Sequence, residues 1–153
     1  GVGEASTAMD YLRNHSLDRV IADLKQPVLG ICIGLQLLCH SSEEGNTHGI
    51  GVFDLDVKRF GPDKALGLKI PHMGWNTISV VKDNPLLTEN MDGAWVYYVH
   101  SYYAPVGTDT IATTEYGNGF SAALHKNNFF ATQFHPEKSG AVGEQVLKNF
   151  VEL

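Results

Sequence analysis

The residue best suited to nucleophilic chemistry is Cys32, in the run Gly30-Ile31-Cys32-Ile33-Gly34. This run has the spacing of a nucleophile elbow, G-x-S-x-G, with cysteine in place of serine. Small residues must flank the nucleophile because the strand-to-helix turn is sharp and strained. The helix N-terminus that follows favours thiolate over thiol. The alternative is a buried packing cysteine, a common fate of free cysteines, and this run alone does not decide between the two.

A cysteine nucleophile needs a base and a group that orients the base. The run Gln133-Phe134-His135-Pro136-Glu137 supplies both after an apolar strand. Residues two apart on an extended segment point the same way, and Pro136 keeps His135 out of the helical region. We therefore expect Glu137 to support His135 while the imidazole faces Cys32. The alternative is a strand-end histidine beside a solvated glutamate; metal binding is disfavoured because no other ligand recurs at a regular spacing nearby.

Together, these two runs resemble the class I (triad) glutamine amidotransferases, and the resemblance covers residues 1–153 as one domain. It implies a Cys-His-Glu triad of Cys32, His135 and Glu137 that hydrolyses glutamine to glutamate and ammonia through a cysteine thioester. No metal and no organic cofactor are implied.

Three further runs narrow the resemblance to the glutaminase subunits of imidazole glycerol phosphate synthases, which serve histidine biosynthesis. They are Pro71-His72-Met73-Gly74-Trp75-Asn76, Tyr97-Tyr98-Val99-His100-Ser101-Tyr102 and Glu137-Lys138-Ser139-Gly140. The resemblance implies a heterodimer with a (β/α)₈-barrel synthase that receives the ammonia. The residues expected at the partner interface are Met73, Trp75, Asn76 and Tyr97. Interfaces favour aromatic side chains, whereas the alternative for Trp75 is a core aromatic.

The same resemblance assigns an oxyanion hole and a glutamine subsite. The backbone N–H groups of Val2 and Ile33 are the expected oxyanion donors, and glycines beside Val2 permit the backbone angles that a peptide flip requires. The expected substrate-binding residues are Gln36, Glu44, Ser101 and Tyr102. Glu44 would pair with the ammonium group, and backbone amides near Ser101 and Tyr102 would hold the carboxylate. The alternative for Gln36 and Glu44 is a polar helix face.

An α/β fold must position these residues. Apolar residues at 17, 20, 21 and 24 predict a helix with Ser16 as its N-cap. The apolar run 28–31 predicts a buried parallel strand, and 35–40 reads as a helix. Further strands are expected at 52–57, 77–81, 95–99, 110–115, 120–125 and 129–134, with a helical stripe at 142–151. The resemblance implies a flavodoxin-like, mostly parallel central sheet flanked by helices, with antiparallel hairpins in the second half.

The composition describes an ordinary globular protein: 153 residues, 43% hydrophobic and 18% charged. A net charge of −6 argues against a nucleic-acid-binding surface. No apolar run approaches membrane-spanning length, no signal peptide is visible, and two cysteines without metal-like spacing suit the cytoplasm. Because Gly1-Val2-Gly3 opens the chain without a strand, we expect the first strand-helix-strand segment of the domain to be missing.

Two other functions stay open. The chain could serve another synthase, such as those for purines, guanylate or anthranilate, although the run from Pro71 to Asn76 argues against this. It could also be a non-catalytic regulatory module on the same fold, although such a module has no physical need for an intact triad.

Overall fold

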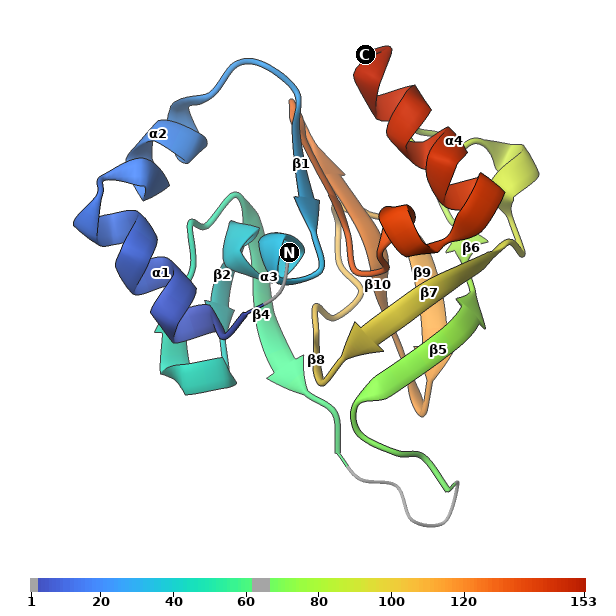
Figure 1. Ribbon diagram of the computed structural model, residues 1–153, viewed down its shortest axis with the longest axis horizontal. Helices are drawn as coiled ribbons and strands as arrows, with labels where there is room; N and C mark the ends of the chain where they lie inside the picture. Colours follow the sequence, from blue (N-terminus) through green and yellow to red (C-terminus); the bar gives the residue numbers. More distant parts are fainter. Residues whose placement is uncertain (1–2, 62–66) are drawn as a thin grey trace.

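The computed structural model describes residues 3–61 and 67–153, and a five-stranded sheet runs through the middle of the molecule (Figure 1). In spatial order its strands are β1 (Val28–Ile31), β11 (Phe129–Thr132), β10 (Asn118–Lys126), β9 (Thr110–Tyr116) and β6 (Ser79–Val80). β1 and β11 are parallel, and the other neighbours are antiparallel. The register places Ile31 beside Thr132, so β1 and β11 end at the same edge of the sheet.

Two smaller sheets complete the β structure. One contains, in spatial order, β3 (Thr47–His48), β2 (Cys39–Ser42), β4 (Phe53–Arg59) and β8 (Tyr102–Tyr103). The other is an antiparallel ribbon of β5 (His72–Thr77) and β7 (Trp95–His100). In the described ranges, parallel pairing joins β1 to β11 and β2 to β4, so the structure is more mixed than the expected mostly parallel sheet. Tight turns at Gly117 and Asn127, both with positive φ, join β9, β10 and β11, and such turns connect antiparallel strands.

The α-helices lie on both sides of the five-stranded sheet. They are α1 (Ala5–Asn14), α2 (Leu17–Asp23), α3 (Ile33–Leu38) and α4 (Gly140–Val151), with short 3₁₀ turns η1 (Glu44–Asn46), η2 (Glu89–Met91) and η3 (Pro136–Lys138). Figure 1 shows α1 and α2 on one side and α4 on the other. Within the described part of the chain, no helix combines the length and apolar character that crossing a membrane requires.

Helices α1 and α2 differ in how well local sequence patterns predict them. The helix predicted from residue 17 is confirmed as α2, but Ser16 sits in the left-handed region, at φ 55°, and its side chain caps nothing. Helix α1 was not predicted because it buries only Ala5 and Met9, too few positions for a clear apolar stripe. Its cap is Glu4, whose side chain accepts hydrogen bonds from Ser6 and Thr7. These bonds lower the pKa of Glu4 to about 2.

Two other elements differ from the sequence prediction. The helix expected over 35–40 ends at Leu38, and Cys39 begins β2. The reason is tertiary, because the loop at 49–51 donates backbone hydrogen bonds to the carbonyls of Leu37, Cys39 and His40. Strand β5 begins at His72, ahead of the strand expected from residue 77. It was not predicted, because polar residues and a glycine hide the apolar–polar alternation of this segment. Cys32 and Cys39 are both free thiols.

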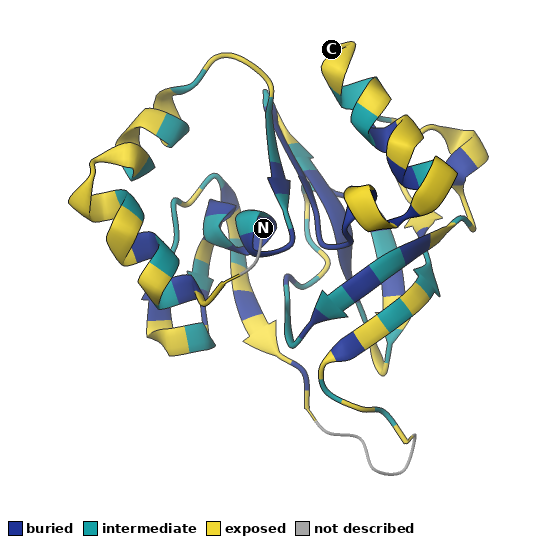
Figure 2. Ribbon diagram, viewed as in Figure 1, coloured by how far each residue is buried: buried dark blue, intermediate teal, exposed yellow. Residues whose placement is uncertain are grey.

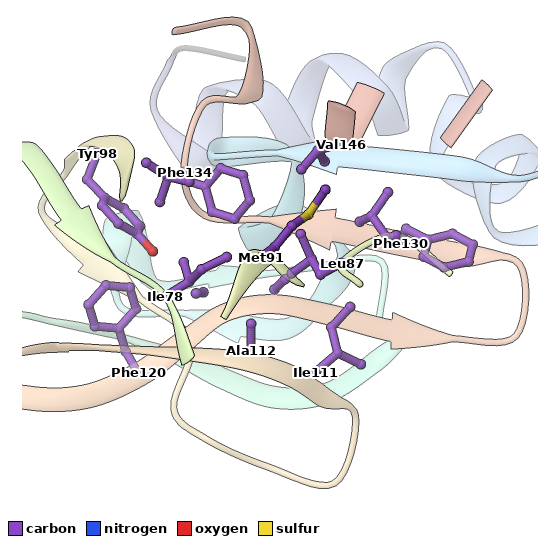
Figure 3. Close-up of a cluster of buried hydrophobic side chains, with 14 of the residues drawn as sticks. Ile78, Leu87, Met91, Tyr98, Ile111, Ala112, Phe120, Phe130, Phe134 and Val146 are labelled. Carbon is purple, nitrogen blue, oxygen red and sulfur yellow. The ribbon is translucent and has the colours of Figure 1, made fainter. Parts of the chain in front are cut away.

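Two buried apolar clusters hold the elements in place. Figure 3 shows the larger cluster, in which Phe120 and Phe130 of the sheet meet Tyr98, Phe134 and Val146. The second cluster joins α3, β2 and β4 to the sheet and includes Leu35, Phe53, Val57 and Leu124. Figure 2 shows buried residues along the central strands and exposed residues on the outer faces of α1, α2 and α4. These two clusters therefore support the sheet edge where β1 and β11 end.

Candidate active site

Cys32 occupies a strained turn between β1 and α3. Its backbone adopts φ 53° and ψ −104°, a positive φ that non-glycine residues rarely take. Its N–H donates to the Thr132 carbonyl at 2.8 Å, which ties the turn to the end of β11. A methyl group at Gly30 would lie 2.8 Å from the Gly34 carbonyl carbon, so the turn needs a glycine at position 30. The expected strand-to-helix turn is confirmed, whereas the role of Cys32 as nucleophile stays a prediction.

His135 and Glu137 lie together just beyond β11. The Nδ1 atom of His135 is 2.6 Å from Glu137 Oε1. Because a carboxylate can only accept, Nδ1 carries a proton, and in the neutral imidazole Nε2 is then the acceptor. The two residues do not share an extended segment as expected, because Pro136 starts the 3₁₀ turn η3. Although burial opposes ionisation of Glu137, the hydrogen bond from His135 lowers the pKa of its carboxyl below the ordinary value.

The Nε2 atom of His135 stands apart in its hydrogen bonding. His135 is 2% exposed, and in residues 3–61 and 67–153 its Nε2 is the one buried side-chain nitrogen or oxygen without a partner. A buried polar atom without a partner is costly. A site that keeps such an atom free has a base ready to accept a proton.

A pocket of about 330 Å³ joins these residues. Its lining consists of Gly3, Cys32, Ile33, Gln36, Glu44, Pro71, Val99, His100, Ser101, Tyr102 and His135. A hollow of this volume suits a small molecule. Cys32, His135 and all four residues expected to bind substrate thus line one space.

Several groups have opposing effects on the pKa of the Cys32 thiol. Burial raises the pKa of the thiol, while the Ile33 backbone N–H and the Gln133 side chain lower it. The sulfur also lies 3.8 Å from the Val99 carbonyl oxygen, which accepts a hydrogen bond from the thiol. The sequence predicted that the helix N-terminus would favour thiolate. In the structure burial outweighs that effect, so a base is needed to take the thiol proton.

Two of the side chains expected to bind substrate also form hydrogen bonds with other groups of the protein. Gln36 is buried, and its Nε2 donates to the Tyr102 carbonyl at 3.0 Å and to Gln133 Oε1 at 3.1 Å. Glu44 Oε1 accepts the Ala5 N–H at 2.6 Å, which fixes the start of α1 beside the pocket. Of the two expected oxyanion donors, Ile33 lines the pocket and Val2 lies outside the described residues.

No group of three or more His, Cys, Asp or Glu side chains within the described ranges is arranged to hold a metal ion. A thiol, an imidazole and a carboxylate gather at the pocket. This set forms and hydrolyses acyl-enzyme intermediates in other proteins. A model of the class-I glutamine amidotransferase family matches residues 1–153.

The chain belongs to the class-I glutamine amidotransferase family.

Similar proteins within this family carry a more specific name. The imidazole glycerol phosphate synthase subunit HisH of Bacteroides fragilis strain YCH46 is 58% identical over 153 residues, which are 100% of this chain and 77% of that protein. HisH of Yersinia pseudotuberculosis is 49% identical over 154 residues, again 100% of this chain and 77% of that protein.

Among solved structures, a putative GMP synthase protein of Thermoplasma acidophilum aligns with a TM-score of 0.67 at 21% identity. The alignment covers 97% of this chain and 66% of that one. A glutamine amidotransferase of Thermotoga maritima gives 0.61 at 22% identity, covering 99% and 58%. These likenesses confirm the α/β fold expected of the family.

One face of the β5–β7 ribbon exposes large apolar side chains in this amidotransferase. Met73 is 63% exposed, Trp75 53% and Trp95 59%. Tyr97 is directly across from Trp75, with ring centroids 6.0 Å apart. Trp95 was not singled out from the sequence, although it precedes Tyr97 by two residues and so shares its face.

Asn76 differs from the other three residues expected at the partner interface. It alternates to the opposite face of β5, where its Nδ2 donates to the Glu115 carbonyl at 2.9 Å and its Oδ1 accepts the Thr77 N–H at 2.8 Å. The exposed apolar face therefore consists of Met73, Trp75, Trp95 and Tyr97 without Asn76.

Sequence reasoning gave no role to two residues that the structure places at the site. His100 lines the pocket and hydrogen-bonds the Tyr102 carbonyl. Gln133 places its side-chain nitrogen 3.5 Å from the Cys32 sulfur. Gln133 is the first residue of the run that carries His135, and this position two residues before His135 was the available signal.

Proposed function

We propose that this chain is the glutaminase subunit of an imidazole glycerol phosphate synthase, which hydrolyses glutamine and delivers ammonia for histidine biosynthesis. The observation that carries the proposal is 58% identity to HisH of Bacteroides fragilis along the whole chain. The amidotransferases of purine, guanylate or anthranilate synthesis remain a weaker alternative. The GMP synthase relative shares only 21% identity, a level that speaks for the fold alone.

The proposed reaction begins with proton transfer from the Cys32 thiol to His135 Nε2. The thiolate attacks the side-chain amide carbon of glutamine, and the carbonyl oxygen becomes an oxyanion. The Ile33 N–H and, by the family resemblance, the Val2 N–H stabilise that charge. His135 then gives its proton to the amide nitrogen, the C–N bond breaks, and ammonia leaves a thioester on Cys32.

Water completes the cycle. His135 Nε2 takes a proton from the water, whose oxygen attacks the thioester carbon. The C–S bond breaks as the proton returns through His135 to the sulfur, and glutamate is released. The sum is glutamine plus water giving glutamate plus ammonia. Glu137 holds His135 in the tautomer with a proton on Nδ1, which the 2.6 Å contact supports.

The substrate's α-groups are held at the other end of the pocket in this proposal. Glu44 pairs with the ammonium group, and backbone N–H groups near Ser101 and Tyr102 hold the carboxylate. Gln36 lines the space between them and the nucleophile. Support comes from the pocket lining, which contains all four residues.

The proposed partner is a (β/α)₈-barrel synthase in a cytoplasmic heterodimer, docked on the apolar face of Met73, Trp75, Trp95 and Tyr97. Exposed aromatic and methionine side chains are enriched at protein interfaces. This face also touches the catalytic machinery, because the Tyr97 carbonyl accepts the His135 N–H at 2.9 Å. A partner that shifts β7 would therefore shift the base.

The test is reconstitution with the barrel synthase and its phosphoribosyl-aminoimidazole substrate. We expect glutamine-dependent formation of imidazole glycerol phosphate and aminoimidazole carboxamide ribotide, lost in Cys32→Ala and kept in Cys39→Ala. Glutamate release without any product from the barrel synthase would assign the chain to a different synthase. Normal turnover by Cys32→Ala would refute the glutaminase mechanism.

A further inference from the structure

The side chain of Gln133 lies between the nucleophile and the wall of the substrate pocket. It is fully buried, and its backbone N–H is anchored to the Ala122 carbonyl at 2.8 Å. Its Nε2 is 3.5 Å from the Cys32 sulfur, within hydrogen-bonding range for sulfur, and its Oε1 accepts from Gln36. No step of the reaction described so far uses this amide.

The hydrogen bonds fix which end of the Gln133 amide faces the sulfur. The Tyr102 carbonyl can only accept, so Gln36 must present its nitrogen there. That same Gln36 nitrogen contacts Gln133, which must therefore present its oxygen. The remaining end of the Gln133 amide, its NH₂ group, points at Cys32. The assignment thus starts from a backbone carbonyl and does not depend on an arbitrary choice of amide orientation.

A buried histidine pair holds the Tyr102 carbonyl in place. His100 Nδ1 donates to that carbonyl at 2.7 Å, so the neutral ring must accept at Nε2, which receives the hydrogen bond from His72 Nδ1–H at 2.9 Å. Burial lowers the pKa of His72 to about 4 and that of His100 to about 3, which keeps both rings neutral near pH 7. The orientation of the Gln133 amide therefore follows from the hydrogen bonds that join His72, His100, the Tyr102 carbonyl and Gln36, because each donor and acceptor in this series is determined.

We propose that Gln133 is a further catalytic residue, whose side-chain N–H donates to the Cys32 sulfur and stabilises the thiolate that attacks glutamine. Gln36 is its positioning residue. Hydrogen bonds to a charged acceptor are stronger than those to a neutral one, so the contact favours the ionised sulfur. Because Cys32 is buried, little water can reach the sulfur to stabilise its negative charge. The role in turnover rests on the proposed function, whereas the effect on thiol reactivity does not.

The experiment measures the rate of Cys32 alkylation by iodoacetamide between pH 6 and 11, in the full-length protein bound to its synthase partner. All proteins carry Cys39→Ala, so that one thiol is followed. The variants are Gln133→Glu and Gln133→Met, which keep the side-chain length and remove the donor. The matched control is Gln145→Glu, the same chemical change on the exposed face of α4.

We expect both variants to alkylate at least about tenfold more slowly at pH 7, because the thiolate fraction falls. The deficit should vanish at high pH, where the thiol ionises without help, and Gln145→Glu should match the parent. In turnover, kcat should fall by a similar factor while KM for glutamine changes less than about threefold.

An unchanged alkylation profile in folded variants would overturn the proposal. So would an equal loss at every pH, since that indicates damage to access or structure. Near-UV circular dichroism reports folding, and the use of two variants keeps the test decisive if one of them does not fold. Failure of turnover with a normal alkylation profile in the unmodified protein would count against the glutaminase function and leave the thiolate contact intact.

Discussion

At the scale of single residues, the site separates its tasks among groups with different environments. Cys32 is buried and its pKa is raised, chiefly by that burial, so it rests as a thiol. His135 keeps Nε2 without a partner among the described residues, and Glu137 fills the other side of the ring. In the proposed mechanism, ionisation of the sulfur depends on proton transfer to that imidazole.

Removal of the base is predicted to cost more than removal of the orienting group. His135→Asn should lower kcat by about 10²- to 10⁴-fold, the usual contribution of a general acid or base. Glu137→Gln should lose less, because that side chain orients the ring and moves no proton. Steady-state glutamate release with the synthase partner checks both. Wild-type rates for His135→Asn would contradict the triad.

The buried histidine pair should make stability depend on pH. Burial lowers the pKa values of His72 and His100 from 6.5 to about 4 and about 3. The stabilisation is complete above pH 6.5 and is lost as pH falls toward 4, because the unfolded chain then binds protons that the folded chain does not. Each histidine should cost about 2 kcal/mol between pH 6.5 and 5, from about 1.4 kcal/mol per pH unit.

Urea denaturation at pH 7 and pH 5 measures this loss. His100→Gln removes one of the two titrations and should shrink the difference between the two pH values by about half. His15→Gln, at an exposed position, is the control and should leave the difference unchanged. An identical pH dependence in His100→Gln and the unmodified protein would show that the pair does not titrate as described.

At the scale of elements, the β1–α3 turn and the β5–β7 ribbon have different structural roles. The turn presents Cys32 to the pocket, and its tight fit at Gly30 fixes where α3 starts. The ribbon shows an apolar face to solvent, while its inner face carries His72 and His100, of which His100 lines the pocket. The His135 N–H donates to the Tyr97 carbonyl of the ribbon, and the Cys32 thiol of the turn donates to the Val99 carbonyl of the same strand.

The two glycines of the elbow should respond differently to alanine. A methyl group at Gly30 meets the backbone of Gly34 at 2.8 Å, whereas a methyl group at Gly34 has no neighbour within 4 Å. Gly30→Ala should therefore destabilise the fold by about 1–3 kcal/mol, as overpacking does. Gly34→Ala, inside α3, should be neutral or stabilising by up to about 1 kcal/mol. Chemical denaturation compares them, and equal effects would contradict the packing described.

Trp75 should act as an anchor for the synthase partner. Trp75→Ala is expected to weaken association by about 2 kcal/mol or more, as the loss of an interface hot spot does. Tyr11→Ala removes an aromatic ring of similar exposure from α1 and is the matched control. Isothermal titration with the barrel synthase gives both affinities. Unchanged binding by Trp75→Ala would mean that the partner docks elsewhere.

At the scale of the whole molecule, features set by neighbours in sequence were the predictable ones. The elbow, the His135–Glu137 contact and most strands of the second half follow from local spacing and turn residues. Strand β2 could not be predicted, because backbone bonds from the 49–51 loop replace the expected helix. The contact between Gln36 and Gln133 joins residues 97 apart, and no local pattern encodes it.

The central claim, that Cys32 is the nucleophile of a glutaminase, is tested most directly by covalent trapping. The complex with the synthase partner is treated with 6-diazo-5-oxo-norleucine, a glutamine-mimicking electrophile, and the labelled peptide is identified by mass spectrometry. Cys39 is an internal control, because burial raises its pKa to about 12. We predict one adduct, on Cys32, formed in step with the loss of glutamate release and prevented by excess glutamine. An adduct on Cys39, or full activity after Cys32 is labelled, would contradict the account.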